Sequence, residues 1–216
     1  MRFAAGGVEL EGDLHLPSGA RGLILFAHGS GSSRLSPRNR AVAADLNEAG
    51  FGTLLLDLLT EEEEIEERYT KHLRFDVMLL ARRLAGLRES LPGELADLPV
   101  GYFGASTGAA AALIAAAMRP RGIAAVVSRG GRPDLAGPAL RDVQAPTLLI
   151  VGSRDGVVIE LNRQAFDQLR VEKEMVLVRG ATHLFEEPGA LEEVSRLATE
   201  WFSRWMQPLS AGAPAY

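Results

Sequence analysis

Short apolar runs recur along the chain and alternate with longer segments in which apolar residues repeat at helical spacing. The runs predict strands at residues 22–27, 53–56, 100–103, 123–127, 147–151 and 175–178. Most of them are apolar without alternation, which is typical of parallel strands buried on both faces. The pattern therefore predicts βαβ units, and with them an α/β fold built on a mostly parallel sheet.

Residues 8–16 have a different pattern, because apolar or small residues alternate there with Glu9, Glu11, Asp13 and His15. Strict alternation is typical of a strand with one face in water. We therefore expect an antiparallel strand at an edge of the sheet, and a mixed sheet as a result.

Helix-start signals fill the segments between the predicted strands. Ser36 followed by Pro37 predicts an N-cap and a first helical turn. Thr60 and Glu63 form a capping box at the start of an acidic run. A final amphipathic helix is expected to begin near Pro188, with both tryptophans packed into the core.

The chain has 216 residues, of which 47% are hydrophobic, so one domain with a large core is expected. We assign residues 1–207 to that domain and predict a flexible tail at 208–216. Neither an internal repeat nor an interdomain linker is visible in the sequence.

Charge and composition narrow the classes of partner. Lys and Arg number 23 against 28 Asp and Glu, a net charge of -5, which argues against a dedicated nucleic-acid binder. The cysteine count of 0 excludes disulfides, thiolate metal sites and a cysteine nucleophile, and it favours the cytoplasm. We see neither a signal sequence nor an apolar run of membrane-spanning length. Oligomeric state stays open, with a homodimer as one expectation.

A GxSxG motif follows the predicted strand at 100–103. Gly104 and Gly108 flank Ser106, and a helix-favouring alanine run comes directly after them. Small flanking residues permit the sharp strand-to-helix turn that exposes a nucleophilic serine, and the Thr107 N–H at the helix start points to where an oxyanion would form. The alternative is a small-residue turn that merely lets the helix pack closely.

A serine nucleophile needs a base, and the sequence offers four histidines. His183 is our candidate, because it lies after the last predicted strand and before the last helix. His15 and His72 are expected on the surface, and His28 is expected to shape the loop that follows its strand.

Asp155 is the expected acid that orients the base. It follows the strand at 147–151 and stands between Ser106 and His183, which gives the order serine, acid, histidine. Asp57 also follows a strand, but it precedes the serine, and its alternative role is to brace the next loop. Ser30, in the glycine-rich loop after His28, is the expected second backbone donor to an oxyanion.

The His28–Gly29 loop, the Gly104–Gly108 motif, Asp155 and His183 in this order resemble the α/β-hydrolase superfamily, especially its small dienelactone-hydrolase-like members. The similarity extends from about residue 22 to 206. It implies a sheet of about eight strands with helices on both faces. It also implies a triad of Ser106, Asp155 and His183, with Ser30 and Thr107 as oxyanion donors. Dienelactone hydrolases themselves use cysteine where this chain has Ser106, so the resemblance supports the fold and triad better than dienelactone as the substrate.

Residues 128–146, where larger superfamily members insert a cap domain, are too few for a bulky lid. We expect an open site shaded by residues 58–75 and by the loop after residue 128. Arg34 or Arg129 is a candidate to bind a carboxylate or phosphate of the substrate. The alternative is that both arginines are bound to local carbonyls or acids.

These features predict a serine hydrolase that cleaves a small carboxylic ester, thioester or lactone through an acyl-enzyme, with no cofactor and no metal. An acyltransferase would use the same residues. A binding protein without catalytic activity, or a module of a larger assembly, are further alternatives.

Overall fold

The computed structural model describes residues 1–206, so the predicted tail at 208–216 lies outside the described residues. Within the described part the chain forms an eight-stranded sheet with the order β1-β2-β4-β3-β5-β6-β7-β8. The strands are β1 (Arg2–Ala5), β2 (Val8–His15), β3 (Leu23–Ala27), β4 (Gly52–Leu56), β5 (Val100–Ala105), β6 (Ala125–Arg129), β7 (Thr147–Gly152) and β8 (Lys173–Val178). Strands β3 to β8 are parallel to one another, whereas β2 is antiparallel to β4 and β1 is antiparallel to β2, which confirms the mostly parallel, mixed sheet.

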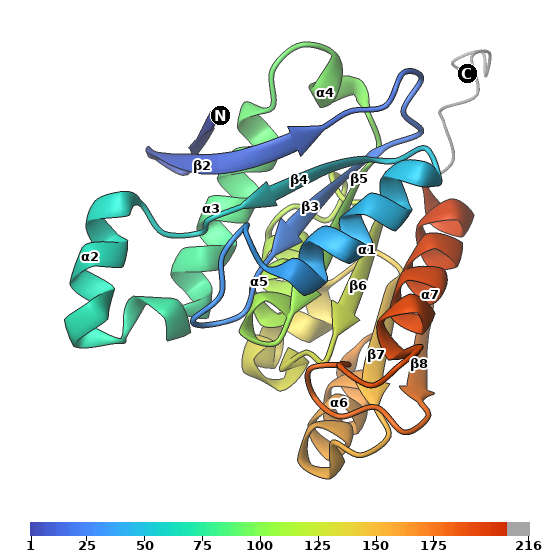
Figure 1. Cartoon of the computed structure of the whole chain (residues 1–216). Coiled ribbons are helices and arrows are strands. Elements are labelled where there is room, and N and C mark those ends of the chain that lie inside the picture. The colour runs from blue at the N-terminus through green and yellow to red at the C-terminus, as the bar shows by residue number, and fades with distance from the viewer. Residues whose placement is uncertain (207–216) are drawn as a thin grey trace.

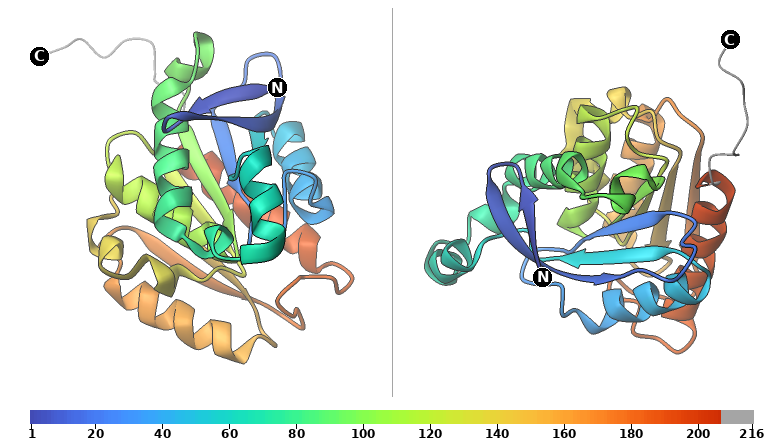
Figure 2. Two further views of the ribbon diagram at one scale, coloured as in Figure 1. Left: turned by 90° about the vertical axis from the view of Figure 1, so that its left-hand side faces the viewer. Right: turned by 90° about the horizontal axis from the view of Figure 1, so that it is seen from above.

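Helices cover both faces of this sheet (Figure 1; Figure 2). They are α1 (Pro37–Glu48), α2 (Glu61–Thr70), α3 (Val77–Ser90), α4 (Glu94–Asp97), α5 (Thr107–Met118), α6 (Gly156–Gln168) and α7 (Ala190–Trp205), with 3₁₀ segments η1 (Leu73–Phe75) and η2 (Pro133–Asp142). Helices α1 and α7 pack on one face, and α3, α5 and α6 pack on the other. The Ser36 cap and the Thr60–Glu63 capping box both form as predicted.

The edge of the sheet differs from the prediction. Strand β2 is antiparallel as expected, but it is not the edge strand, because β1 pairs with its outer side. Gly6 and Gly7 join the two strands, with φ of 58° and 93°. Two consecutive glycines at positive φ make the kind of tight turn that a hairpin requires, and this pair was the missed signal.

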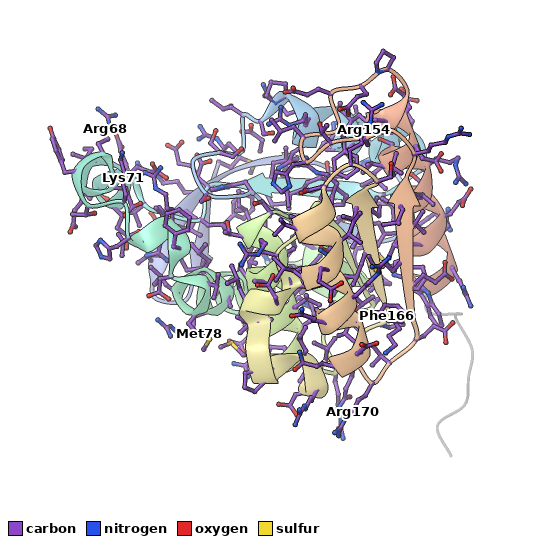
Figure 3. All side chains as sticks on the ribbon, turned by 90° about the horizontal axis from the view of Figure 1, so that it is seen from below. Arg68, Lys71, Met78, Arg154, Phe166 and Arg170 are labelled. Carbon is purple, nitrogen blue, oxygen red and sulfur yellow. The ribbon has the colours of Figure 1, made fainter. Side chains whose placement is uncertain are left out.

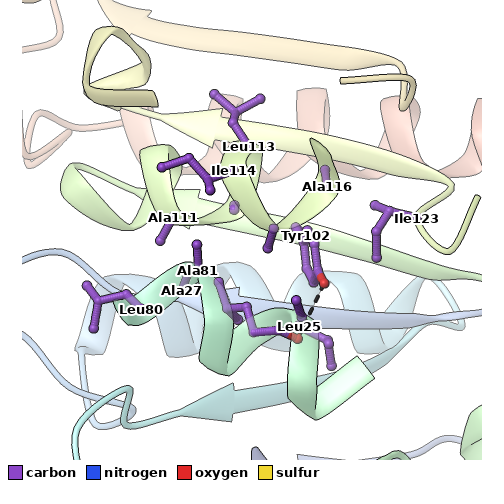
Figure 4. Packing of buried hydrophobic residues seen from close by; sticks show 14 of the residues in the cluster. Leu25, Ala27, Leu80, Ala81, Tyr102, Ala111, Leu113, Ile114, Ala116 and Ile123 are labelled. Atoms are coloured by element: carbon purple, nitrogen blue, oxygen red, sulfur yellow. Dashed lines mark hydrogen bonds between the residues drawn. The ribbon is translucent and has the colours of Figure 1, made fainter. Parts of the chain in front are cut away.

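Each sheet face has its own apolar core. The α3–α5 face is lined by small and branched residues, and α5 is buried along most of its length (Figure 4). Tyr102 of β5 lies fully buried among them, and its hydroxyl donates a hydrogen bond of 3.4 Å to the Leu84 carbonyl of α3. Because each central strand is buried on both faces, its register against the neighbouring strands is fixed, and so is the position at which it ends.

Residues 61–75, which contain α2 and η1, form an arm that stands away from the rest of the fold (Figure 1). Glu67 is its buried centre: the carboxylate accepts hydrogen bonds from the Leu73 N–H at 2.7 Å and the Arg74 side chain at 2.5 Å. Burial alone would raise the pKa of Glu67, but these bonds outweigh it and lower the pKa to about 2. The outer surface of the arm carries Arg68 and Lys71 (Figure 3).

The base of the arm is anchored to α3. Buried Arg83 forms a bidentate ion pair with Glu63 and donates a hydrogen bond of 2.6 Å to the Leu58 carbonyl. Residues 128–146, where a cap was not expected, hold the short η2. Within residues 1–206, no helix is long and apolar enough to span a membrane.

Candidate active site

The carboxyl ends of β3 and β5 meet side by side, although the chain makes β4 between them. Strand order reverses at this point, since β4 lies on one side of β3 and β5 on the other. Open α/β sheets bind ligands in the crevice above such a reversal. The loop after His28 and the turn at Ser106 both lie there.

Ser106 has a strained backbone, with φ 51° and ψ −123°. Few residues other than glycine adopt positive φ, and the cost is of order 1–3 kcal/mol. The surroundings hold the strain in place: the Ser106 N–H donates to the Arg129 carbonyl at 3.3 Å, and the Ser106 carbonyl accepts from the N–H groups of Ala109 and Arg132 at 3.1 and 3.0 Å. The residue sits between fully buried β5 and the first turn of α5.

The two flanking glycines are required by packing. A Cβ at Gly104 would lie 2.4 Å from the Ala109 Cα, and a Cβ at Gly108 would lie 2.2 Å from the Ala27 carbonyl oxygen. Neither contact is sterically allowed. The glycines therefore let α5 start directly against β3 and β5, which is the geometric role predicted for the motif.

His183 and Asp155 come together across the loops that follow β8 and β7. His183 Nδ1 lies 2.7 Å from Asp155 Oδ2. An ionised carboxylate can only accept, so Nδ1 carries the proton and Nε2 is left with a free lone pair. Asp155 is at the N-cap position before α6, but its side chain makes no capping hydrogen bond and contacts His183 instead.

Backbone contacts hold these two loops in register. The Arg154 N–H donates to the Ala181 carbonyl at 2.9 Å, and the Ser153 hydroxyl accepts from the Gly180 N–H at 2.8 Å. A Cβ at Gly152 would lie 2.5 Å from the Thr182 carbonyl oxygen, so glycine permits the close approach. Figure 3 shows Arg154 beside the start of α6, at the opposite end from Phe166.

Ser106 and His183 line one cavity of about 380 Å³. The cavity is also lined by Gly29, Ser30, Gly31, Ser32, Ser36, Arg38, Asn39, Ala105, Arg129, Gly130 and Leu184. The His183 side chain is 39% exposed and the Asp155 side chain 16% exposed. Ser106 and His183 therefore share a cavity that a small molecule can enter, and Asp155 contacts the Nδ1 side of the imidazole.

The two predicted oxyanion donors are in contact with each other. The Ser30 N–H donates a hydrogen bond of 2.8 Å to the Thr107 Oγ1. The Thr107 N–H lies at the first position of α5, where a helix offers its own N–H groups no acceptor. Both residues lie beside Ser106, but the Ser30 amide already has a partner.

Arg129 is the last residue of β6, not the first residue beyond it, and its side chain is buried with 6% exposure. Its guanidinium donates to Asn39 Oδ1 at 2.9 Å and lies 5.8 Å from the centre of the Phe185 ring. Burial, together with nearby Arg38, lowers the pKa of Arg129 from 12.5 to about 10. Among residues 1–206 no carboxylate pairs with it, and its Nε has no hydrogen-bond partner. Arg129 is therefore an uncompensated buried cation beside Ser106.

Arg34 occupies a different place. Its guanidinium pairs with Asp57, with Glu11 at 2.7 Å and with Asp13 at 3.5 Å, and it lines a separate acidic cavity. Asp57 also accepts the Arg34 N–H at 2.7 Å, and so it braces this loop. For Arg34 the arrangement matches the alternative expectation of local acids, and Asp57 is not brought to His183.

The other three histidines do not line the cavity of Ser106. His15 and His72 are exposed. His28 is buried, with Nδ1 donating to the Gly29 carbonyl at 2.9 Å and Nε2 accepting the Leu58 N–H at 3.2 Å. Burial lowers the pKa of His28, so the ring is neutral and ties the glycine-rich loop after β3 to the base of the arm.

Sequence reasoning missed Arg38, Asn39 and Phe185. Asn39 is buried in α1 and orients Arg129; Arg38 lines the same cavity and reaches Glu186 at 3.0 Å. Phe185 is buried at φ 56°, a strained residue just after His183. Asn39, an asparagine near a predicted helix start, gave a weak sequence signal for a role at the site. Arg38 and Phe185 gave no such signal.

A second cavity, of about 430 Å³, lies on the other side of the glycine-rich loop. It shares Gly29, Ser30 and Ser36 with the first cavity and is walled by Arg74 and Glu64 of the arm. Leu59, Glu64 and Arg74 of residues 58–75 line this cavity, but no described residue of that segment lines the cavity of Ser106 and His183, so the structure does not show the expected shading there. Within residues 1–206, no cluster of three or more potential metal ligands is found.

Comparison with known proteins is consistent with this arrangement. No family model matches the chain. A dienelactone hydrolase from Anabaena variabilis superposes with a TM-score of 0.93 at 56% identity, covering 95% of this chain and 96% of that one. Est1E from Butyrivibrio proteoclasticus, at 16% identity and a TM-score of 0.76, covers 95% and 98% and shares the fold.

A Mycobacterium tuberculosis protein, whose name provisionally calls it a phosphoribosyl transferase, is 55% identical over 204 residues. The match covers 94% of this chain but only 45% of that protein, so this chain spans about half of its relative's length. The Anabaena structure, by contrast, is matched over 96% of its chain. The fold, the strained Ser106 turn and this match show that the chain belongs to the dienelactone hydrolase-like proteins of the α/β-hydrolase superfamily.

Proposed function

We propose that this protein is a serine hydrolase that cleaves a small carboxylic ester, thioester or lactone through an acyl-enzyme on Ser106. The observation that carries the proposal is the 2.7 Å contact between His183 Nδ1 and Asp155 Oδ2 at the cavity that Ser106 also lines. A base held by a carboxylate beside a strained serine is the arrangement that nucleophilic acyl transfer requires.

In the first half of the reaction, Ser106 Oγ attacks the substrate carbonyl carbon while His183 Nε2 takes the hydroxyl proton. The carbonyl π electrons move onto oxygen, and hydrogen-bond donors beside Ser106, the Thr107 N–H among them, stabilise the negative charge. When the intermediate collapses, the bond to the leaving group breaks and His183 returns the proton to it. Asp155 stabilises the imidazolium throughout.

In the second half, water replaces the leaving group. His183 Nε2 takes a proton from water, whose oxygen attacks the acyl carbon. Collapse of the second intermediate breaks the bond to Ser106 Oγ, and His183 returns the proton to the serine. The acid product leaves, and the enzyme is restored without any cofactor or metal ion.

Arg129 is our candidate for recognising the substrate. A buried cation without an acidic partner is costly unless a ligand neutralises it. Its place in the same cavity as Ser106 supports binding of a carboxylate or phosphate group on the substrate. Arg38 lies close enough to lower the pKa of Arg129 and would add to the attraction for an anion. We therefore propose an anionic acyl substrate.

Labelling with a fluorophosphonate tests the proposal directly. Wild-type protein should gain the mass of one phosphonyl adduct, and Ser106→Ala should gain none. A panel of short p-nitrophenyl esters, thioesters and lactones, with neutral and carboxylated acyl groups, then measures kcat and KM. Equal turnover by wild type and Ser106→Ala would overturn the proposed function.

An acyltransferase is the second candidate, because the same residues would form the same acyl-enzyme. The 39% exposed His183 side chain favours hydrolysis, since water can reach the base. Product analysis with and without added alcohol separates the two: a transferase makes the new ester in preference to the free acid.

The cellular compartment and the oligomeric state of the protein are also matters of proposal, as is its relation to longer relatives. The match covers 45% of the M. tuberculosis protein, and the rest of that protein lies outside the match. We propose a cytoplasmic enzyme that acts on a small molecule. Its mass on size-exclusion chromatography would distinguish a monomer from a homodimer.

A further inference from the structure

The Thr107 hydroxyl accepts the hydrogen bond that the Ser30 N–H was expected to donate to an oxyanion. Thr107 is the first residue of α5, and it is buried with 6% exposure. Its Oγ1 accepts the Ser30 N–H at 2.8 Å, which is a full-strength hydrogen bond between segments 77 residues apart. An oxyanion could use the Ser30 N–H directly only by breaking this bond.

Thr107 keeps two unused donors of its own. A threonine hydroxyl has one hydrogen to donate in addition to the lone pairs with which it accepts. Within residues 1–206 the hydroxyl of Thr107 accepts from Ser30 and donates to no group, and the Thr107 N–H has no acceptor in the helix it begins. Both donors belong to the residue that directly follows the nucleophile.

We infer that Thr107 holds the oxyanion twice, through its backbone N–H and its side-chain O–H, and that the Ser30 N–H orients the hydroxyl instead of contacting the substrate. The inference rests on the proposed acyl transfer at Ser106 and changes only which groups hold the oxygen. A hydroxyl that accepts one hydrogen bond becomes a stronger donor in the next, because the bonds polarise each other.

This assignment agrees with two other features of the site. Ser106 caps α5 without a side-chain hydrogen bond, so its hydroxyl is left for chemistry. His28 fixes the loop that carries Ser30, because its ring donates a hydrogen bond to the Gly29 carbonyl and accepts one from the Leu58 N–H. The Ser30 N–H is therefore a fixed donor that sets the direction of the Thr107 hydroxyl before substrate arrives, which is the preorganisation an oxyanion site needs.

The test removes the hydroxyl and keeps everything else. Thr107→Val has nearly the same shape and retains the backbone N–H, and Thr107→Ser retains the hydroxyl. The matched control is Thr147→Val, which makes the same change at another buried threonine, whose hydroxyl donates to the Ala145 carbonyl at 3.0 Å at the opposite end of the sheet. The assay uses the p-nitrophenyl ester that wild type turns over fastest.

We expect Thr107→Val to lower kcat about 100-fold with little change in KM, because the lost donor acts mainly in the transition state. Thr107→Ser should keep most of the activity, and Thr147→Val should keep wild-type kcat. A Thr107→Val kcat equal to or above that of wild type would overturn the inference, because it would show that the Ser30 amide is the donor and that the hydroxyl only occupies it.

Two measurements keep the inference separate from folding and from the proposed function. Thr107→Ala removes the same hydroxyl if the valine variant unfolds, and it carries the same expectation. In wild-type protein, a boronic acid bound to Ser106 should shift the Thr107 amide nitrogen resonance far more than that of Ser30; the reverse would refute the assignment. Failure of Ser106 to react with boronic acid or fluorophosphonate would refute the proposed function itself.

Discussion

Replacing Arg129 with methionine should stabilise the protein and remove its response to anions. Burial lowers the pKa of Arg129 from 12.5 to about 10, which corresponds to about 3 kcal/mol of folding free energy. The sign follows from the charge: the protonated form is disfavoured in the folded state, so the cost is present at every pH below about 10 and disappears only as the pH rises toward 12.5. Neutral pH is therefore a suitable condition for the test.

Methionine fills a similar volume without a charge, but it loses two contacts. The hydrogen bond to Asn39 and the approach to the Phe185 ring are together worth about 2 kcal/mol. The difference leaves a gain of about 1 kcal/mol, or a rise in Tm of about 3 °C for a chain of this length. Urea unfolding and calorimetry at pH 7 measure both quantities.

The anion response is measured in the same experiment. Sodium phosphate or acetate should raise the Tm of wild type relative to sodium chloride at equal ionic strength. At an anion concentration ten times its Kd, the free energy of unfolding should rise by about 1.4 kcal/mol. Arg129→Met should show no such rise. Arg132→Met is the matched control: Arg132 already pairs with Asp134 at 2.8 Å, so its loss should lower stability slightly and leave the anion response intact.

Two results would refute the reasoning. A loss of more than about 1 kcal/mol in Arg129→Met would mean that the charge is compensated in the free protein. Equal stabilisation of wild type and Arg129→Met by anions would place the anion elsewhere.

Three further predictions concern the carboxylate, the buried histidine and the turn. Asp155→Asn should lower kcat by about 10⁴-fold with Tm little changed, whereas Asp57→Asn should retain activity; comparable losses in both would contradict the assignment of Asp155. Burial lowers the pKa of His28, so below pH 6.5 the unfolded chain takes up a proton that the folded chain does not, and stability falls as the pH drops. His28→Gln should flatten this dependence in urea titrations between pH 7.5 and 5.5, and an unchanged slope would argue against it. Gly108→Ala places a Cβ 2.2 Å from a carbonyl oxygen of β3 and should cost about 3 kcal/mol or more, whereas Gly156→Ala, with nothing within 4 Å, should be nearly neutral.

The central sheet could be predicted because its signal is local. Each buried parallel strand is a short apolar run, and the structure has strands at all the predicted positions, with β6 displaced to Ala125–Arg129 and β8 lengthened to Lys173–Val178. The turn at Ser106 could be predicted for the same reason, since its glycines are adjacent in sequence. Strand β1 was missed because a four-residue strand gives almost no periodic pattern.

The partners of charged residues could not be predicted from the sequence. Arg34 lies in the polar loop after one predicted strand and Arg129 near the end of another, and neither local sequence shows which acids its side chain meets. Only the folded chain brings three carboxylates to Arg34 and, among the residues that the structure describes, leaves Arg129 without an acid. The bond from Ser30 to Thr107 is similar, because it joins residues whose relation depends on the pairing of β3 with β5.

The arm at residues 61–75 has a consequence for how this protein can change. Its polar contacts are mostly internal, through Glu67, and it meets the body chiefly where Glu63 pairs with Arg83. Substitutions on the outer face of the arm, or replacement of the whole arm, would therefore leave the sheet and its hydrogen bonds undisturbed. The arm also walls the cavity beside the glycine-rich loop. Substitutions in this segment can therefore reshape that cavity while the sheet that carries Ser106 keeps its structure.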